Sequence, residues 1–131
     1  MLAANVSILP VVNQMQVSPF MYRPQLIESF TKRGIQVASH KSIHRGEFLD
    51  NDVIQSLASK YSKSPAQIMI KWGLQKNFIV ISKTSSLDRM KQNRDIFDFS
   101  LSSEDVGKLD NLTDEEEVSI RFKHEMKSRE D

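Results

Sequence analysis

The chain has 131 residues and a mass of 15.1 kDa, which suits one domain and leaves no room for two independent cores. Hydrophobic residues account for 39% and charged residues for 27%, so the composition predicts a packed core and excludes collagen-like and low-complexity proteins. The 18 Lys and Arg and the 17 Asp and Glu leave a formal charge of +1. This argues against nucleic acid as a partner, because phosphate backbones require a broad basic surface.

The cysteine and histidine content narrows the chemistry further. Without cysteine, the chain has no disulfide, no thiolate nucleophile and no Cys-based zinc site. Its three histidines, His40, His44 and His124, lack the spacing of metal ligands. No apolar run approaches the roughly 20 residues that cross a bilayer, and the first residues lack the basic start of a secretory signal. We therefore expect a cytoplasmic protein with no membrane partner.

The first part of the chain predicts a strand, a helix and a second strand in close succession. Residues 9–16 (LPVVNQMQ) combine an apolar start with the alternation of a short strand. Residues 23–33 place apolar side chains at helical spacing, with Pro24 in the first turn and Gly34 as a C-terminal stop. Residues 35–39 (IQVAS) are apolar and β-prone, so they are expected to form the next strand.

Two helices and a third strand are predicted next. Apolar side chains recur with a period of 3.6 residues over 51–61, which is typical of an amphipathic helix. Ser64 and Gln67 form a capping-box pattern around Pro65, so another helix is expected to begin there. The run FIVIS at 78–82 is apolar throughout, which predicts a parallel strand covered on both faces.

The last third of the chain predicts two more helices and a polar end. A helix starting near Leu87 is expected to carry Met90 and Phe97 on an apolar stripe. Ser102, with an aspartate three residues later, is expected to cap the second helix. Residues 113–131 are charged and poor in aromatic residues, which favours a position on the surface.

Strands that alternate with helices predict an α/β protein built from βα units with a buried parallel sheet. A closed βα barrel needs eight strands and about 250 residues. Only three strands are predicted here, so the chain is either a small open sheet or a partial barrel.

The most informative segment is 78–93, in which a buried strand leads through a Thr-Ser-Ser turn into a helix. The N-terminus of a helix has unpaired N–H groups and a partial positive charge, so it favours a phosphate, and Lys83 adds a cation at the strand end. Arg89, Gln92 and Asn93 fall at i, i+3 and i+4, on one face of the helix. Such a face can bind a phosphate through Arg and a heterocycle through two amides. From spacing alone, the alternative is a solvated helix face behind a serine N-cap.

Two stretches resemble the C-terminal half of the aldo-keto reductases, which are NADP-dependent carbonyl reductases with a (β/α)8 TIM barrel. One is PVVNQMQVSPF at 10–20, and the other combines SPAQIMIKWGLQKNFIVISKTSSLDRMKQNRDIFDF with LSSEDVGKLDNL within 64–112. The second stretch has the family's spacing of Lys, Arg, Gln and Asn. The resemblance implies an NADP(H) site whose 2′-phosphate and adenine end is bound by Lys83, Thr84, Ser85, Arg89, Gln92 and Asn93.

The resemblance implies two further cofactor contacts. Gln14 matches a family glutamine that hydrogen-bonds the nicotinamide carboxamide, and the alternative is a strand-end Gln satisfied by the backbone. His40 occupies the position of a family tyrosine whose ring stacks on the nicotinamide, and the alternative is an ordinary loop histidine. His44 and His124 match no family role, so we expect them on the surface.

The catalytic Asp, Tyr, Lys and His of the family lie on strands that would precede Met1, and no residue here replaces them. Tyr22 and Tyr61 are the only tyrosines, and neither is expected to donate a proton beside a lysine. Carbonyl reduction needs both a hydride source and a general acid. The chain therefore predicts part of a cofactor site without the acid.

Three hypotheses follow, of which the first is a fragment of an aldo-keto reductase barrel over 1–112 with a charged tail over 113–131. The second is a non-catalytic nucleotide-binding or interaction module derived from that family. The third is a small self-standing α/β domain of unrelated function. Strands taken from a barrel expose their edges, so the first hypothesis also predicts self-association, with Val11, Val37 and Ile79 exposed.

Overall fold

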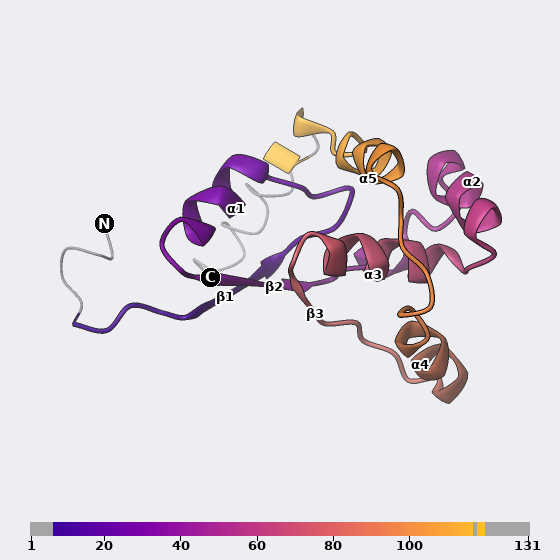
Figure 1. Cartoon of the computed structure of the whole chain (residues 1–131), viewed down its shortest axis with the longest axis horizontal. Coiled ribbons are helices and arrows are strands. Elements are labelled where there is room, and N and C mark those ends of the chain that lie inside the picture. Colours follow the sequence, from indigo (N-terminus) through magenta and orange to yellow (C-terminus); the bar gives the residue numbers. More distant parts are fainter. Residues whose placement is uncertain (1–6, 117, 120–131) are drawn as a thin grey trace, which may run out of the picture.

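The computed structural model describes residues 7–116 and 118–119 and contains a three-stranded parallel sheet in the order β1-β2-β3 (Figure 1). The predicted α/β class and the alternation of strands with helices are confirmed. None of the helices in this described part is long and apolar enough to span a membrane. In chain order the elements are β1 (Val12–Gln16), α1 (Pro24–Thr31), β2 (Gln36–His40), the 3-10 turn η2 (His44–Gly46), α2 (Asp52–Tyr61), α3 (Pro65–Gln75), β3 (Ile79–Val80), α4 (Leu87–Arg94) and α5 (Ser103–Asp110).

The register of the sheet separates a core face from an open face. Gln14 lies beside Ala38, and Ala38 lies beside Ile79, so their side chains share one face. Ile79 is 46% exposed and Val11 is 75% exposed, as predicted. The prediction for Val37 was wrong, because it points to the opposite face and is only 2% exposed within the core.

The core lies between that face of the sheet and the helices α1 and α3, and α2 packs against α3. Its largest fully buried side chain is Trp72, the single tryptophan of the chain, whose Nε1 donates to Asp110 at 2.8 Å. The predicted capping box at the start of α3 is present, with Ser64 and Gln67 each bonding the other's backbone N–H. Gly34, three residues after the last residue of α1, adopts a φ of +72°, which matches its predicted role as a stop. These local predictions were correct because each depends on neighbouring residues only.

Two apolar patterns are more exposed than predicted. β3 covers two residues instead of the whole run 78–82, and Ile81, which follows it, is 44% exposed although its N–H still bonds Ser39 O at 2.9 Å. The helix predicted from Leu87 to Phe97 ends at Arg94, so Phe97 lies beyond it and is 78% exposed. No described element covers the side of α4 that carries the exposed Leu87 and Met90.

His44 was predicted to lie on the surface, and this was wrong. Its side chain is buried, with Nδ1 3.1 Å from the hydroxyl of Ser18, and its ring meets the rings of Phe20 and Phe48 edge to face. The contact joins the connection after β1 to the connection after β2. Sequence spacing does not reveal it, because the partners lie far apart in the chain. His124 falls outside the described residues.

Asp105 is a fully buried carboxylate that fastens α5 to α2. Its oxygens accept hydrogen bonds from Lys60 Nζ and Tyr61 Oη at 2.6 Å each, from Ser102 Oγ at 2.9 Å and from Lys108 Nζ at 3.1 Å. The hydrogen bond from Lys60, followed by that from Tyr61, holds the pKa of Asp105 well below its usual range. The ionised carboxylate is therefore the form that stabilises the fold.

We expect Asp105→Asn to lower the free energy of unfolding at pH 7 by about 1.5–3 kcal/mol, the value of a hydrogen bond to a charged group. Because folding lowers the pKa of this carboxyl, its contribution is complete above the unfolded value of about 3.9 and is lost as the pH falls through the lower folded value. Urea unfolding between pH 7 and pH 3 measures this difference. The wild-type chain should lose more stability than the variant over this range, whereas exposed Asp50→Asn should follow the wild type. Parallel curves for Asp105→Asn and the wild type would refute the assignment.

Candidate functional site

Six of the eight predicted site residues lie on the turn that follows β3 and on α4. Thr84 Oγ1 accepts a hydrogen bond from Ser86 N at 3.1 Å, which turns the chain after the strand. Ser86 Oγ then accepts from Arg89 N at 3.4 Å and caps α4. The strand, turn and helix predicted for this segment are therefore present. The six residues are Lys83, Thr84, Ser85, Arg89, Gln92 and Asn93.

The segment presents cations and amides to the exterior. Lys83 and Arg89 are exposed, and neither forms an ion pair within residues 7–116 and 118–119. Gln92 is also exposed, whereas Asn93 is half-buried and donates from Nδ2 to Ser82 Oγ at 3.4 Å. That bond links α4 to the chain leaving β3. The arrangement leaves two cations available to an anion beside the N-terminus of α4.

The other two predicted residues lie on the open face of the sheet. Gln14 is exposed in the middle of β1, and half-buried His40 ends β2. Gln16 lies beside His40 in the register, so the side chains of Gln14 and His40 point to the same face. Lys83 follows β3 at the carboxyl end of the next strand. In open parallel sheets, ligands bind beside the carboxyl ends of the strands.

Sequence reasoning missed the residues that hold the far end of α4. Gln67 was recognised as part of a capping box, but its Nε2 also donates to the carbonyls of Gln92 and Asp95 at 3.0 and 2.7 Å. Buried Lys71 donates from Nζ to Ile96 O at 3.0 Å. The capping pattern was the only signal in the sequence, and it accounts for one half of the contacts of Gln67.

A tyrosine, a lysine and an aspartate do meet in the structure, at the Asp105 cluster. Tyr61 Oη donates to Asp105 and accepts from Ser102 N at 2.9 Å, so it has one structural partner in each direction. Lys60 contacts the same carboxylate. The hydroxyl that a proton donor would offer to a substrate is thus used to fix α5 against α2.

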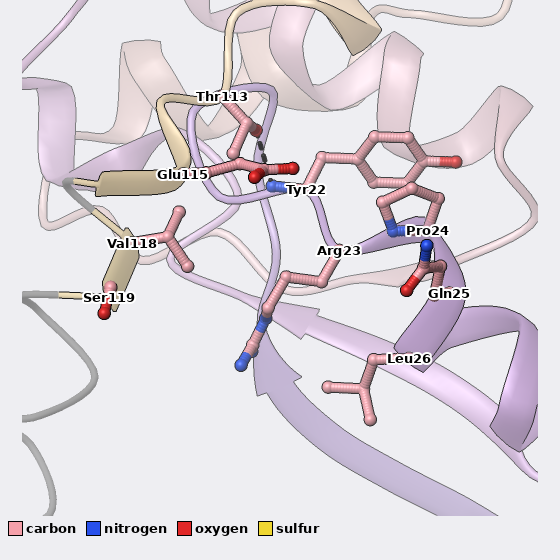
Figure 2. A pocket seen from close by; sticks show the side chains of 9 residues that line it. All are labelled: Tyr22, Arg23, Pro24, Gln25, Leu26, Thr113, Glu115, Val118 and Ser119. Carbon is pink, nitrogen blue, oxygen red and sulfur yellow. Dashed lines mark hydrogen bonds between the residues drawn. The ribbon is translucent and has the colours of Figure 1, made fainter.

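A cavity of about 440 Å³ lies away from the predicted site, between the start of α1 and the segment after α5 (Figure 2). Thr113 forms one wall, where its Oγ1 accepts from Tyr22 N and donates to Pro19 O, both at 2.8 Å. None of the eight predicted residues contributes to it. The lining residues are Tyr22, Arg23, Pro24, Gln25, Leu26, Thr113, Glu115, Val118 and Ser119.

Comparison with known proteins places this geometry in context. The chain is 41% identical over 115 residues to an oxidoreductase of Schizosaccharomyces pombe, C2F3.05c, and 37% identical over 117 residues to glyoxal reductase of Bacillus subtilis. The alignments cover 88% and 89% of this chain but 42% of each relative, so the chain spans less than half the length of the curated relatives it matches.

Solved structures give the same result. A point mutant of Gox0644 in complex with NADPH superposes with a TM-score of 0.83 at 31% identity, over 88% of this chain and 42% of that one. MGS-M4, an aldo-keto reductase from a deep-sea metagenome library, gives a TM-score of 0.83 at 29% identity, over 86% and 42%. The three strands and their helices therefore form part of an aldo-keto reductase barrel. With residues 3–114 also matching the Aldo/keto reductase family, the chain belongs to that family.

Proposed function

We propose that this chain binds NADP(H) through the adenosine 2′-phosphate end of an aldo-keto reductase cofactor site and lacks the catalytic tetrad of the reductases. The observation that carries the proposal is the segment 83–93, in which two exposed cations and two amides flank the capped start of α4. The NADPH complex of Gox0644, to which the chain is similar, supports the choice of cofactor. The protein is then a cytoplasmic oxidoreductase fragment.

Each residue of the segment has a role in this proposal. Lys83 and Arg89 neutralise the 2′-phosphate, and Arg adds the bidentate geometry that suits phosphate oxygens. The Thr84 hydroxyl oxygen already accepts from Ser86 N, so its hydrogen is the part that points to the phosphate. Ser85 is exposed beside it and supplies a second hydroxyl.

The remaining contacts extend along the dinucleotide. Gln92 and Asn93 offer amides to the adenine from the face of α4 that also carries Arg89. Gln14 hydrogen-bonds the nicotinamide carboxamide, and His40 contacts the nicotinamide ring. An imidazole offers less stacking area than the family's tyrosine, so the nicotinamide end is held more weakly than the adenosine end.

The alternative function is that of a non-catalytic nucleotide-binding or interaction module derived from the same family. The partial coverage of the relatives is compatible with both candidate functions. The resemblance places the catalytic tetrad in a segment that residues 1–131 do not include. The two candidate functions predict different results when a polypeptide that supplies the N-terminal half of the barrel is added. If a polypeptide that supplies the N-terminal half restores carbonyl reduction, the chain is a reductase fragment, whereas a module binds nucleotide with or without it.

We expect Arg89→Ala to weaken NADP(H) binding about tenfold or more and to leave NAD(H) binding nearly unchanged. Loss of a charge-assisted bond to phosphate is worth about 1.5–3 kcal/mol, and NAD(H) has no 2′-phosphate. Titration of NADPH and NADH fluorescence with each protein measures both constants.

The matched control is Lys91→Ala, which removes an exposed cation from α4 two positions away, on a different face of the helix. This control should bind NADPH like the wild type. Equal losses for both cofactors in Arg89→Ala, or the same loss in Lys91→Ala, would contradict the role of Arg89.

A further expectation is that the chain alone does not reduce carbonyls. A positioned acid contributes about 100- to 10,000-fold, and precise orientation contributes roughly 7–11 kcal/mol, so their joint loss brings the rate close to background. NADPH oxidation with nitrobenzaldehyde measures this. Turnover above about 0.1 per second that disappears in the Lys83→Ala/Arg89→Ala double variant would contradict this expectation. It would show that the 131 residues contain a general acid that the sequence did not reveal.

We also propose that two copies of the chain associate through the open face and edges of the sheet. In the described part of the chain, β1 and β3 each pair with β2 only, and Val12, Ile79 and Ile81 are each at least 44% exposed on the open face. Light scattering should therefore give a mass above 15.1 kDa that rises with concentration. Ile79→Lys should shift the chain toward monomer, and Leu26→Lys on α1 should not. A concentration-independent monomer would overturn this proposal.

A further inference from the structure

We infer that Gln67, on α3, is a positioning residue for the cofactor site on α4, and that it acts by bonding the carbonyl groups at the end of that helix. The inference rests on the function proposed above, because it concerns the helix face that carries Arg89, Gln92 and Asn93. Gln67 does not touch the proposed ligand. It determines where that face lies.

The reason lies in how little apolar contact holds α4. None of its residues is buried, and its apolar side chains Leu87 and Met90 are 63% and 55% exposed. A helix of 8 residues is too short to be stable in isolation. Contacts at the two ends of α4 must therefore fix its position, and its N-terminal end is held by the turn that leaves β3.

Gln67 supplies two hydrogen bonds at the other end, where Asn93 Nδ2 also donates to Ser82 Oγ. The Gln67 side chain is only 6% exposed, and its Nε2 lies 3.0 Å from Gln92 O and 2.7 Å from Asp95 O. Gln92 belongs to the last turn of α4 and Asp95 is the C-cap residue of that helix. Gln92 O also accepts from Asp95 N at 3.0 Å, whereas Asp95 lies where helix carbonyls lose their intrahelical partners. The Oε1 of Gln67 accepts a hydrogen bond from Ser64 N at 2.8 Å. Both donors and the acceptor of one buried amide are thus satisfied, and two of the three bonds reach α4.

The neighbouring polar contacts act on the chain beyond the helix. Lys71 bonds the carbonyl of Ile96, and Lys63 Nζ lies 2.6 Å from Asp98 and 3.5 Å from Asp95. Gln67 alone among these three side chains bonds the backbone of Gln92, a residue of the proposed site. A shift of this carbonyl moves the site face directly, which is how supporting hydrogen bonds control a binding site.

The structure offers a substitution that separates this role from helix capping. In Gln67→Glu the carboxylate still accepts from Ser64 N, as Glu does in ordinary capping boxes, but it cannot donate to Gln92 O or Asp95 O. Gln75 provides a matched control on the same helix, because its amide bonds both the N–H and the carbonyl of Leu101, before α5. Gln75→Glu removes an amide donor from the same helix, at an exposed position, without touching α4.

The experiment measures NADPH affinity by fluorescence titration and amide hydrogen exchange of residues 87–94 for the wild type, Gln67→Glu and Gln75→Glu. We expect Gln67→Glu to bind NADPH about tenfold more weakly and to exchange faster in α4 without cofactor. Gln75→Glu should stay within about twofold of the wild type in affinity, with normal exchange in α4. If Gln67→Glu does not fold, Gln67→Asn replaces it, since its amide lies one methylene further from both carbonyls.

Wild-type affinity and exchange in Gln67→Glu would overturn the inference, as would an equal loss of affinity in Gln75→Glu. If the wild-type chain binds no NADPH, the proposed function fails and the cofactor role of Gln67 fails with it. Exchange in the ligand-free proteins still decides whether Gln67 holds α4, so the two failures are distinguishable.

Discussion

The alternation of side chains across a parallel sheet is the constraint on which the rest of this structure depends. Successive residues of a strand point to opposite faces, so the register that places Gln14 beside Ala38 also decides which side chains meet the helices. One face is covered by α1 and α3 and contains the core. The other presents Gln14 together with exposed Ile79. Both the candidate site and the proposed self-association arise from this second face and its carboxyl edge.

Outside the core, polar side chains hold three segments of the chain in place. Asp105 fastens α5 to α2, Gln75 fastens the approach to α5, and Gln67 fastens the end of α4. In each case a polar side chain, buried for Asp105 and Gln67 and exposed for Gln75, bonds groups outside its own helix. Such contacts are directional and lose their value when the geometry shifts, so they fix the orientation of helices more sharply than apolar packing does.

Local features could be predicted from the sequence, and features set by distant contacts could not. The capping box at Ser64 was correct because both partners lie within one turn. His44 was assigned to the surface because it matches no family role, and its buried contact with Ser18, in a separate segment, leaves no local signal in the sequence. Val37 was predicted to be exposed because the sequence predicts the strand but not which of its two faces the helices cover. The residues of the candidate site were identified by the resemblance to the aldo-keto reductases, whereas the contacts that hold them, above all the second role of Gln67, required the fold.

The hydroxyl of Thr113 has a consequence for how the chain folds during synthesis. It bonds Pro19 O and Tyr22 N across sequence separations of 94 and 91 residues, the longest among the side-chain hydrogen bonds of the described residues. The connection between β1 and α1 therefore reaches its final packing only after Thr113 has been synthesised and has packed against it. Closing a loop of this length is entropically costly and raises the contact order of the fold. Among the described segments, the connection that follows β1 is thus secured late.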